Sequence, residues 1–279
     1  MLKKLLSGSC GILLGICLFS GLAFAENDHK DNDKDCKDLP SQAALKAALK
    51  TATFPLGTST TNGGFGLNMW ATVVNRDGEV CAVAFTGGDR GDQWPGSRVI
   101  SAQKANTANA FSLPGLALST ANLYSAVQPG GSLFGLQESN PVDTSVAYGG
   151  NEEKFGQKDD PMVGNKIGGV NVFGGGLALY KNFGTAGSPD VRLVGAIGVS
   201  GDTSCADHSI AWKTRHGLVL DFVPGGVDGF GSDNIVFDIT PQPLQMPGVS
   251  AKGWGQPACI AETQAKANAL RLAFPISHP

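Results

Sequence analysis

Glycine is the residue that most constrains how this chain can fold. Its 39 copies among 279 residues are about twice the usual share of roughly 7%, which implies many turns and close backbone contacts. Such a chain is unsuited to a helical bundle and favours a fold that contains a sheet. The hydrophobic fraction of 42% excludes a disordered chain. A net charge of -3 gives no basic excess for binding nucleic acid.

The first 25 residues have the pattern of a secretory signal peptide. Lys3 and Lys4 precede an apolar stretch, and Ala23-Phe24-Ala25 at its end fits a signal-peptidase site. The sequence therefore predicts a cleaved Sec-type signal over 1–25 and a polar arm over 26–40. We expect a periplasmic or secreted protein, with no membrane span after the signal is removed.

Four cysteines remain after the predicted cleavage, and an even number in an oxidising compartment suggests two disulfides. Cys205 lies at the start of a predicted helix and Cys259 lies in a tail that needs a tether, so the sequence predicts a bridge between them. Cys36 and Cys81 either pair with each other or stay reduced. No spacing is Cys-x-x-Cys, which argues against a structural zinc site or a thioredoxin-like redox site.

The predicted elements follow the order of an antiparallel sheet covered by helices. The predicted helices span 41–52, 97–111, 119–127, 203–218 and 261–274. The predicted strands span 67–75, 79–87, 166–174, 176–182 and 191–201. Asp77-Gly78 predicts a hairpin turn between the first two strands. Asp202 or Thr203 is the expected N-cap of the helix that follows the last strand.

The motifs of familiar catalytic sites are absent. Gly198-Val199-Ser200-Gly201-Asp202 is similar to a nucleophile elbow, but Asp202 stands where a second flanking glycine is required. The sequence contains neither a phosphate-binding loop nor H-E-x-x-H. It therefore gives no support to a serine hydrolase of that type or to a nucleotide-dependent enzyme.

Three segments together carry a family resemblance. They are the hairpin MWATVVNRDGEVCAVAF, the helix SRVISAQKANTANAF with its K-A-x-x-A core, and the block LVGAIGVSGDTSCADHSIAW. Over about residues 41–217 the chain resembles the GlcG/HbpS-like haem-binding family, also called the haem-degrading domain family. The resemblance implies an α+β, profilin-like fold with a five-stranded antiparallel sheet flanked by helices. It also implies haem as cofactor and a homo-oligomer.

Two segments depart from the family pattern. Residues 128–166 form a long insert where the family has a short connection, and residues 218–279 form a C-terminal extension that we expect to pack on the domain. A long segment without regular structure inside a domain is often functional. Either segment can cover or reshape a ligand site.

One face of the last domain helix carries candidate haem ligands. His208 and Trp212 are four residues apart, and Arg215 follows three residues later. Under a haem-binding interpretation His208 coordinates the iron, Trp212 stacks nearby and Arg215 pairs with a propionate. Under a structural interpretation His208 is an ordinary helix-surface or interface histidine and Trp212 packs under the tail. His216 closes the helix, where a partly protonated imidazole suits the C-terminal dipole.

Two basic residues on the helix over 97–111 are further candidates. Lys104 lies on an apolar stripe in the K-A-x-x-A core, and Arg98 precedes it on the same helix. They either bind the carboxylates of a porphyrin or another anionic ligand, or Lys104 forms a structural ion pair.

The sequence thus predicts an exported haem-binding protein, with haem or a related tetrapyrrole in a cleft between helices and sheet. Two alternatives stay open. One is an enzyme with haem-degrading or iron-linked redox activity, although a catalytic role is less expected and no catalytic residue is identified. The other is an oligomeric accessory protein that binds a protein partner.

Overall fold

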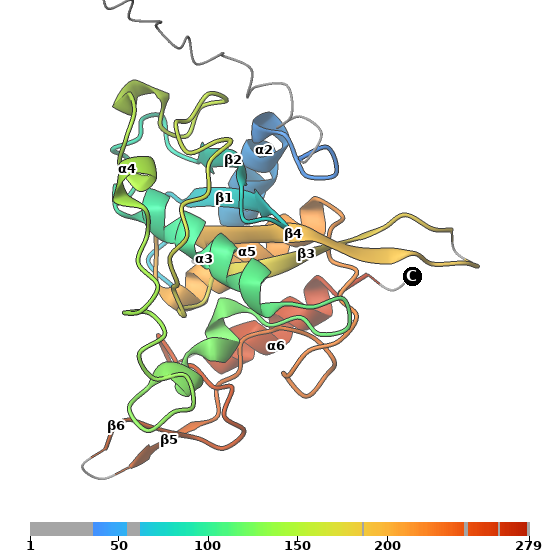
Figure 1. Ribbon diagram of the computed structural model, residues 1–279. Coiled ribbons are helices and arrows are strands. Elements are labelled where there is room, and N and C mark those ends of the chain that lie inside the picture. Colours follow the sequence, from blue (N-terminus) through green and yellow to red (C-terminus); the bar gives the residue numbers. More distant parts are fainter. Residues whose placement is uncertain (1–35, 55–61, 186, 243–244, 262, 278–279) are drawn as a thin grey trace, which may run out of the picture.

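The computed structural model describes residues 36–54, 62–185, 187–242, 245–261 and 263–277 (Figure 1). The signal peptide predicted over 1–25 and most of the arm over 26–40 lie outside the described residues. The helices are α2 (Gln42–Thr53), α3 (Ser97–Phe111), α4 (Thr144–Ala147), α5 (Ser204–Gly217) and α6 (Thr263–Ala273). The strands are β1 (Trp70–Asn75), β2 (Val80–Phe85), β3 (Gly176–Asn182), β4 (Val191–Ser200), β5 (Ile239–Gln242) and β6 (Gln245–Ser250). Among the described helices, none has the length and apolar character needed to cross a membrane.

Four strands form the main sheet, in the order β2-β1-β4-β3, with every neighbouring pair antiparallel. The predicted α+β class is confirmed, but the expected fifth strand is wrong. The segment 166–174 has no continuous ladder, because Gly168 and Gly169 both adopt positive φ and interrupt the extended backbone. Within the described part of the chain, the strands β5 and β6 pair only with each other, in the C-terminal extension.

Capping side chains and a turn glycine explain where two helices begin and where the first hairpin reverses direction. The Ser41 hydroxyl accepts a hydrogen bond from the backbone N–H of Ala44 and caps α2. Thr203 is the N-cap of α5, as the sequence allowed, and its hydroxyl accepts from Ala206. Gly78 has a φ of 78° and joins β1 to β2 in the predicted hairpin.

The helix predicted over 119–127 is instead two short 3-10 helices, Thr120–Leu123 and Ser125–Val127. Ser119 and Asn122 cap each other reciprocally, since the Asn122 side chain accepts from the backbone N–H of Ser119 at 3.0 Å. This local bonding closes a single tight turn and competes with a continuing α-helix.

Helices cover both faces of the main sheet. α3 packs on one face through an apolar cluster with β1 and β2, while α2 and α5 pack on the other face around a second cluster. Gly198 of β4 permits the close approach of α3, because a Cβ there would lie 1.9 Å from the carbonyl oxygen of Ser101. The C-terminal extension joins the α2 and α5 side through Leu270 of α6, which is buried in that cluster.

A disulfide ties the start of the described chain to the sheet. Cys36 and Cys81 are bonded, with their Cα atoms 5.7 Å apart. Of the two alternatives left by the sequence, pairing is therefore confirmed. The bond holds the segment before α2 against β2.

Candidate functional site

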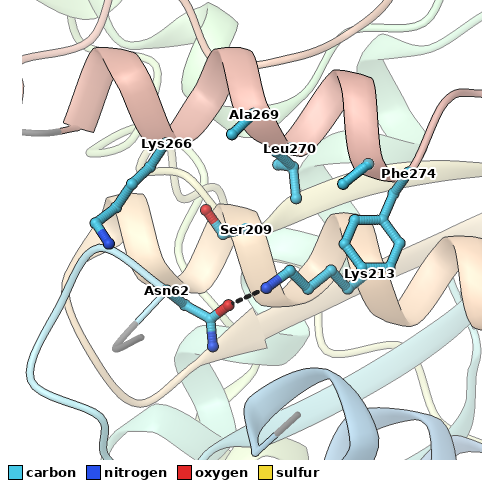
Figure 2. Close-up of a pocket in the computed structure, with 8 residues that line it drawn as sticks. Asn62, Ser209, Lys213, Lys266, Ala269, Leu270 and Phe274 are labelled. Carbon is cyan, nitrogen blue, oxygen red and sulfur yellow. Dashed lines mark hydrogen bonds between the residues drawn. The ribbon is translucent and has the colours of Figure 1, made fainter. Parts of the chain in front are cut away.

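A cavity of ≈180 Å³ lies between α5 and α6 and is lined by two lysines, Lys213 and Lys266 (Figure 2). The Nζ atom of Lys213 donates to Asn62 Oδ1 at 2.5 Å and lies 5.5 Å from the centre of the Phe274 ring. Burial lowers the pKa of Lys213, and the positive charge of Lys266 lowers it further. An anionic group placed between the two ammonium groups would relieve this repulsion.

A larger cleft of ≈450 Å³ lies next to this cavity, between α2 and the C-terminal end of α5. Lys213 and Phe274 line both spaces, so the two are neighbours. On the α2 side the cleft wall consists mainly of small apolar side chains, namely Ala44, Ala47, Ala48 and Ala52. On the α5 side it contains an imidazole, that of His216. The cleft thus combines an apolar wall with one imidazole and one lysine ammonium group.

The His216 imidazole is oriented by a buried carboxylate. Its Nδ1 lies 2.7 Å from Oδ2 of Asp221, which is almost fully buried, whereas the His216 side chain is 35% exposed. Phe274 packs edge-on against the imidazole, with ring centres 5.6 Å apart. A carboxylate on Nδ1 fixes the tautomer in which Nε2 carries the free lone pair. This is the orientation that a metal-binding histidine needs.

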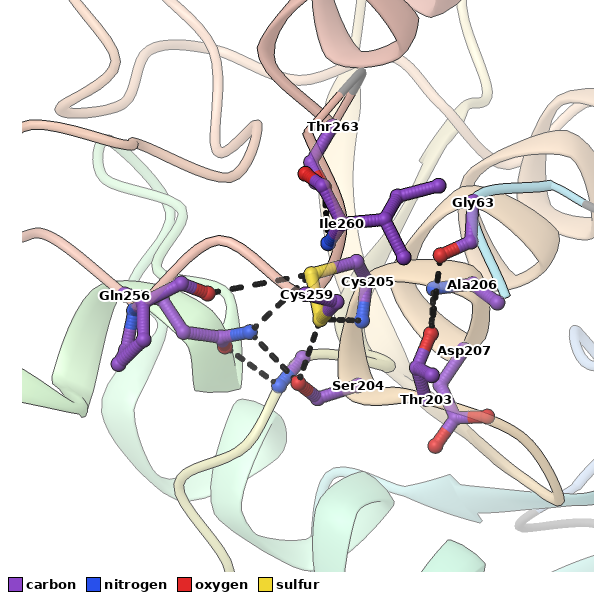
Figure 3. The surroundings of a disulfide bond; sticks show 12 residues. Gly63, Thr203, Ser204, Cys205, Ala206, Asp207, Gln256, Cys259, Ile260 and Thr263 are labelled. Carbon is purple, nitrogen blue, oxygen red and sulfur yellow. Dashed lines mark hydrogen bonds between the residues drawn. A yellow bond between two sulfur atoms is a disulfide. The ribbon is translucent and has the colours of Figure 1, made fainter. Parts of the chain in front are cut away.

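A disulfide anchors the extension that supplies Phe274 (Figure 3). Cys205 and Cys259 are bonded, with Cα atoms 6.1 Å apart, as the sequence predicted. Gln256 reinforces the junction, because its side chain donates to Ser204 Oγ at 2.8 Å and accepts from the backbone N–H of Gly174. One wall of the cleft is therefore fixed to the N-terminal turn of α5.

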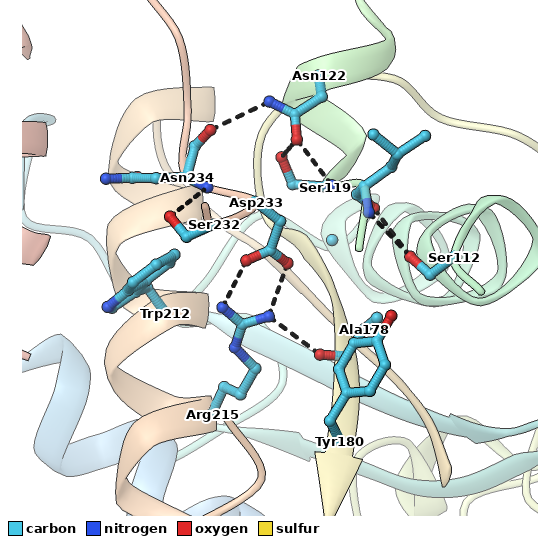
Figure 4. A network of polar contacts seen from close by, with 12 residues as sticks. Ser112, Ser119, Asn122, Ala178, Tyr180, Trp212, Arg215, Ser232, Asp233 and Asn234 are labelled. Atoms are coloured by element: carbon cyan, nitrogen blue, oxygen red, sulfur yellow. Dashed lines mark hydrogen bonds and ion pairs between the residues drawn. The ribbon is translucent and has the colours of Figure 1, made fainter. Parts of the chain in front are cut away.

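The candidate set on α5 lies inside the fold. Arg215 is fully buried and forms a bidentate ion pair with Asp233 at 2.7 and 2.8 Å (Figure 4). The Trp212 indole donates to the carbonyl oxygen of Phe274 at 2.8 Å. His208 is also fully buried, and its Nε2 accepts a hydrogen bond from Ile235 at 3.1 Å. His208, Trp212 and Arg215 do lie together, as the sequence placed them on one helix face. Each of them, however, contacts the C-terminal extension, which covers this face.

We predict that His208 makes the protein sensitive to acid. Burial lowers its pKa from 6.5 to about 4, so protonation favours the unfolded state. The stability due to the neutral imidazole is complete above pH 6.5 and is lost towards pH 4, by about 3 kcal/mol. Urea unfolding of the wild type and His208→Gln at pH 4, 5.5 and 7 measures this. The wild type should lose stability relative to the variant as the pH falls.

The same experiment separates His208 from a second buried group. Burial raises the pKa of Asp207 from 3.8 to about 6, so this carboxyl opposes His208 and favours the folded state as the pH falls from about 6. Both proteins in the comparison contain Asp207, and its contribution cancels in their difference. A difference that does not change with pH would contradict the role given to His208.

The candidates on α3 also have internal partners. Lys104 forms a buried ion pair with Asp207 at 2.7 Å and donates to the carbonyl oxygen of Val199, which matches the structural alternative in the sequence analysis. Arg98 is paired with Asp160 of the insert through Nε and Nη2, and its guanidinium lies 3.7 Å from the centre of the Phe155 ring. The fold does not bring Arg98 and Lys104 together with His208 around one open space. Haem contact by these five residues stays a prediction.

Sequence reasoning assigned His216 a capping role and missed its position in the cleft. The available signal was Lys213 three residues earlier, which places a cation and an imidazole on one helix face. Of the four histidines, His29 and His278 lie outside the described residues, and His208 is enclosed. Among the described histidines, His216 is thus the one that a ligand can approach.

The residues of the cleft fit a planar iron porphyrin. The volume of the cleft, ≈450 Å³, lies within the usual range of about 300–1,000 Å³ for small-molecule sites. The apolar α2 wall and Phe274 suit a flat apolar macrocycle, and His216 offers Nε2 to an iron. Lys213 lines the cleft and Lys266 lines the adjoining cavity, so both can neutralise propionates that extend from the cleft into that cavity. An iron ligand and positive charges for the propionates are therefore available here without breaking the buried ion pairs of Arg98, Lys104 and Arg215.

One comparison with known proteins identifies a family. The family described as "Haem degrading protein HbpS-like" matches residues 44–215, more than half of the chain. No curated protein sequence matches the chain. Among solved structures, it is similar to Klebsiella pneumoniae protein ORFY of family DUF336, with 23% identity over 64% of this chain and 89% of that one, and a TM-score of 0.40. It is also similar to the PduOC:heme complex, with 20% identity over 63% and 89%, and a TM-score of 0.41.

Proposed function

This chain belongs to the HbpS-like family of haem-degrading proteins, and we propose that it is an exported protein that binds haem in the cleft between α2 and α5. The observation that carries the proposal is the His216 imidazole, which is 35% exposed and held by Asp221 at 2.7 Å. When bound, haem would supply an iron centre. His216 would coordinate it through Nε2, while Lys213 and Lys266 would pair with the propionates.

Export is supported by two independent features. The N-terminal residues have the charge and apolar pattern of a cleaved signal peptide. Two disulfides are formed, and such bonds persist mainly in oxidising compartments. A periplasmic or secreted location is therefore part of the proposal.

Hemin titration of the purified protein, followed by absorbance, tests the haem site. We expect a sharp Soret band, and we expect His216→Ala to weaken hemin binding about tenfold or more. Lys213→Gln should weaken binding less, and Lys50→Gln is the matched control because Lys50 is exposed on α2 outside the cleft. If His208→Gln abolishes the Soret band while His216→Ala leaves it unchanged, the site is not in this cleft.

The family description favours haem degradation as a second function. Adding a reductant and oxygen to the hemin complex separates binding from degradation. Loss of the Soret band with formation of an open-chain tetrapyrrole would support an enzyme. A stable band would support a binding protein. If no hemin complex forms, the better interpretation is an accessory protein that binds a protein partner.

A further inference from the structure

A second cleft, of ≈430 Å³, lies on the opposite face of the main sheet, beside the N-terminal end of α3. Trp70 of β1 and Arg98 of α3 line it on the domain side. Tyr148 and Phe155, both from the insert over 128–166, line it on the other side. The cleft proposed for haem lies on the α2 and α5 face, and none of the described residues lines both clefts.

The insert is held firmly enough to form a fixed wall. Asp160 pairs with Arg98 and also accepts backbone hydrogen bonds from Gly156 and from Met162. Arg98 in turn donates to the carbonyl oxygen of Ala147 at 2.9 Å. A glycine is required at 156, because a Cβ there would lie 2.2 Å from the Phe85 ring and 2.9 Å from the Trp70 ring. The insert therefore lies directly on the aromatic floor of the cleft.

Arg90 supplies a positive charge to this cleft that no described side chain neutralises. The Trp70 ring lines the floor of the cleft, and its indole Nε1 is buried beneath that surface. Arg90 has no ion-pair or hydrogen-bond partner within the described part of the chain, and Tyr148 is 64% exposed. Among the residues that the structure describes, Asp89 is the one carboxylate that lines the cleft, and its Oδ1 already accepts from Gly91 at 2.8 Å.

We propose that this cleft binds an aromatic carboxylate. The carboxylate would pair with Arg90, the ring would pack between Tyr148 and Phe155, and Trp70 would contact that ring from the floor of the cleft. Arg98 stays paired with Asp160 and stiffens the floor. The insert would thus give this chain a small-molecule site of its own, and the proposal does not rest on haem binding.

Titration of the full chain with naphthoate tests the proposal, with its uncharged amide naphthamide as the ligand control. The readout is the set of indole N–H signals in a nitrogen-15 NMR spectrum, with the Trp70 signal assigned through Trp70→Phe. We expect naphthoate to shift the Trp70 signal in a saturable way while Trp212 and Trp254 stay unchanged. Naphthamide should bind at least about fivefold more weakly, because it lacks the charge that pairs with Arg90.

Variants at the cleft mouth provide the second test. Arg90→Gln should weaken naphthoate binding about fivefold, whereas Arg192→Gln should not, because Arg192 is an exposed arginine of β4 paired with Asp190. Neither substitution removes a buried group, so both proteins should fold. Hemin binding should be unchanged in Arg90→Gln, which separates this site from the haem site. An unshifted Trp70 signal, or equal weakening by both arginine variants, would overturn the proposal.

Discussion

A variant in which both Cys205 and Cys259 are replaced by alanine is expected to lose about 4 kcal/mol of unfolding free energy. The bond joins residues 54 positions apart, and in the chain-entropy model such a cross-link restricts the unfolded chain by about that amount. It also joins α5 to the extension, where Gln256 hydrogen-bonds across the junction (Figure 3). The loss should appear in urea unfolding under non-reducing conditions.

Replacing Cys36 and Cys81 by alanine is the matched control. It also removes a disulfide, but it leaves the attachment of the extension to α5 intact. That bond joins residues 45 positions apart and should contribute a similar entropic term, but it holds the segment before α2. Limited proteolysis within residues 218–279 should therefore increase only in the Cys205 and Cys259 variant. Equal protease resistance of the extension in both variants would contradict its role as a tether.

Asp233→Asn is expected to destabilise the protein by about 3–5 kcal/mol, because it leaves the Arg215 guanidinium buried without a counter-charge. Both side chains are fully buried in the wild type, and Arg215 also donates to the carbonyl oxygen of Ala178 (Figure 4). The pair links α5 to the loop of the extension. Urea unfolding at neutral pH measures the loss.

An exposed ion pair supplies the control for Asp233→Asn. Asp190 and Arg192 form a salt bridge whose side chains are 45% and 64% exposed, so Asp190→Asn should cost no more than about 1 kcal/mol. A double variant, Arg215→Met with Asp233→Leu, should recover much of the loss, since apolar replacement of a buried pair is often close to neutral. A loss as small for Asp233→Asn as for Asp190→Asn would show that the buried pair has no structural role.

The local elements of the domain were predictable because their signals act over a few residues. The helices over 42–53 and 97–111 follow from apolar periodicity, and the turn at Gly78 follows from its tolerance of positive φ. The fifth strand was not predictable in this way. The segment 166–174 contains strand-forming residues, but paired glycines at positive φ override them.

The candidate site was harder to predict, because the sequence contains no information about what covers a side chain. Lys104 and Arg98 were identified as unusual basic residues, but their partners Asp207 and Asp160 lie 103 and 62 positions away. The Asp221 carboxylate that orients His216 is only five residues further along the chain. Even so, no local pattern distinguishes it from an ordinary loop aspartate.

By itself, the sequence determined the family, the main helices, the α+β class and the Cys205–Cys259 pair. Only the tertiary structure decided which histidine a ligand can reach. His208 and His216 lie eight residues apart on one helix, and both have aromatic and basic neighbours. The extension covers the first and leaves the second partly exposed beside α2. Burial is a property of the packed chain, because it depends on segments remote in sequence that fold back over the helix.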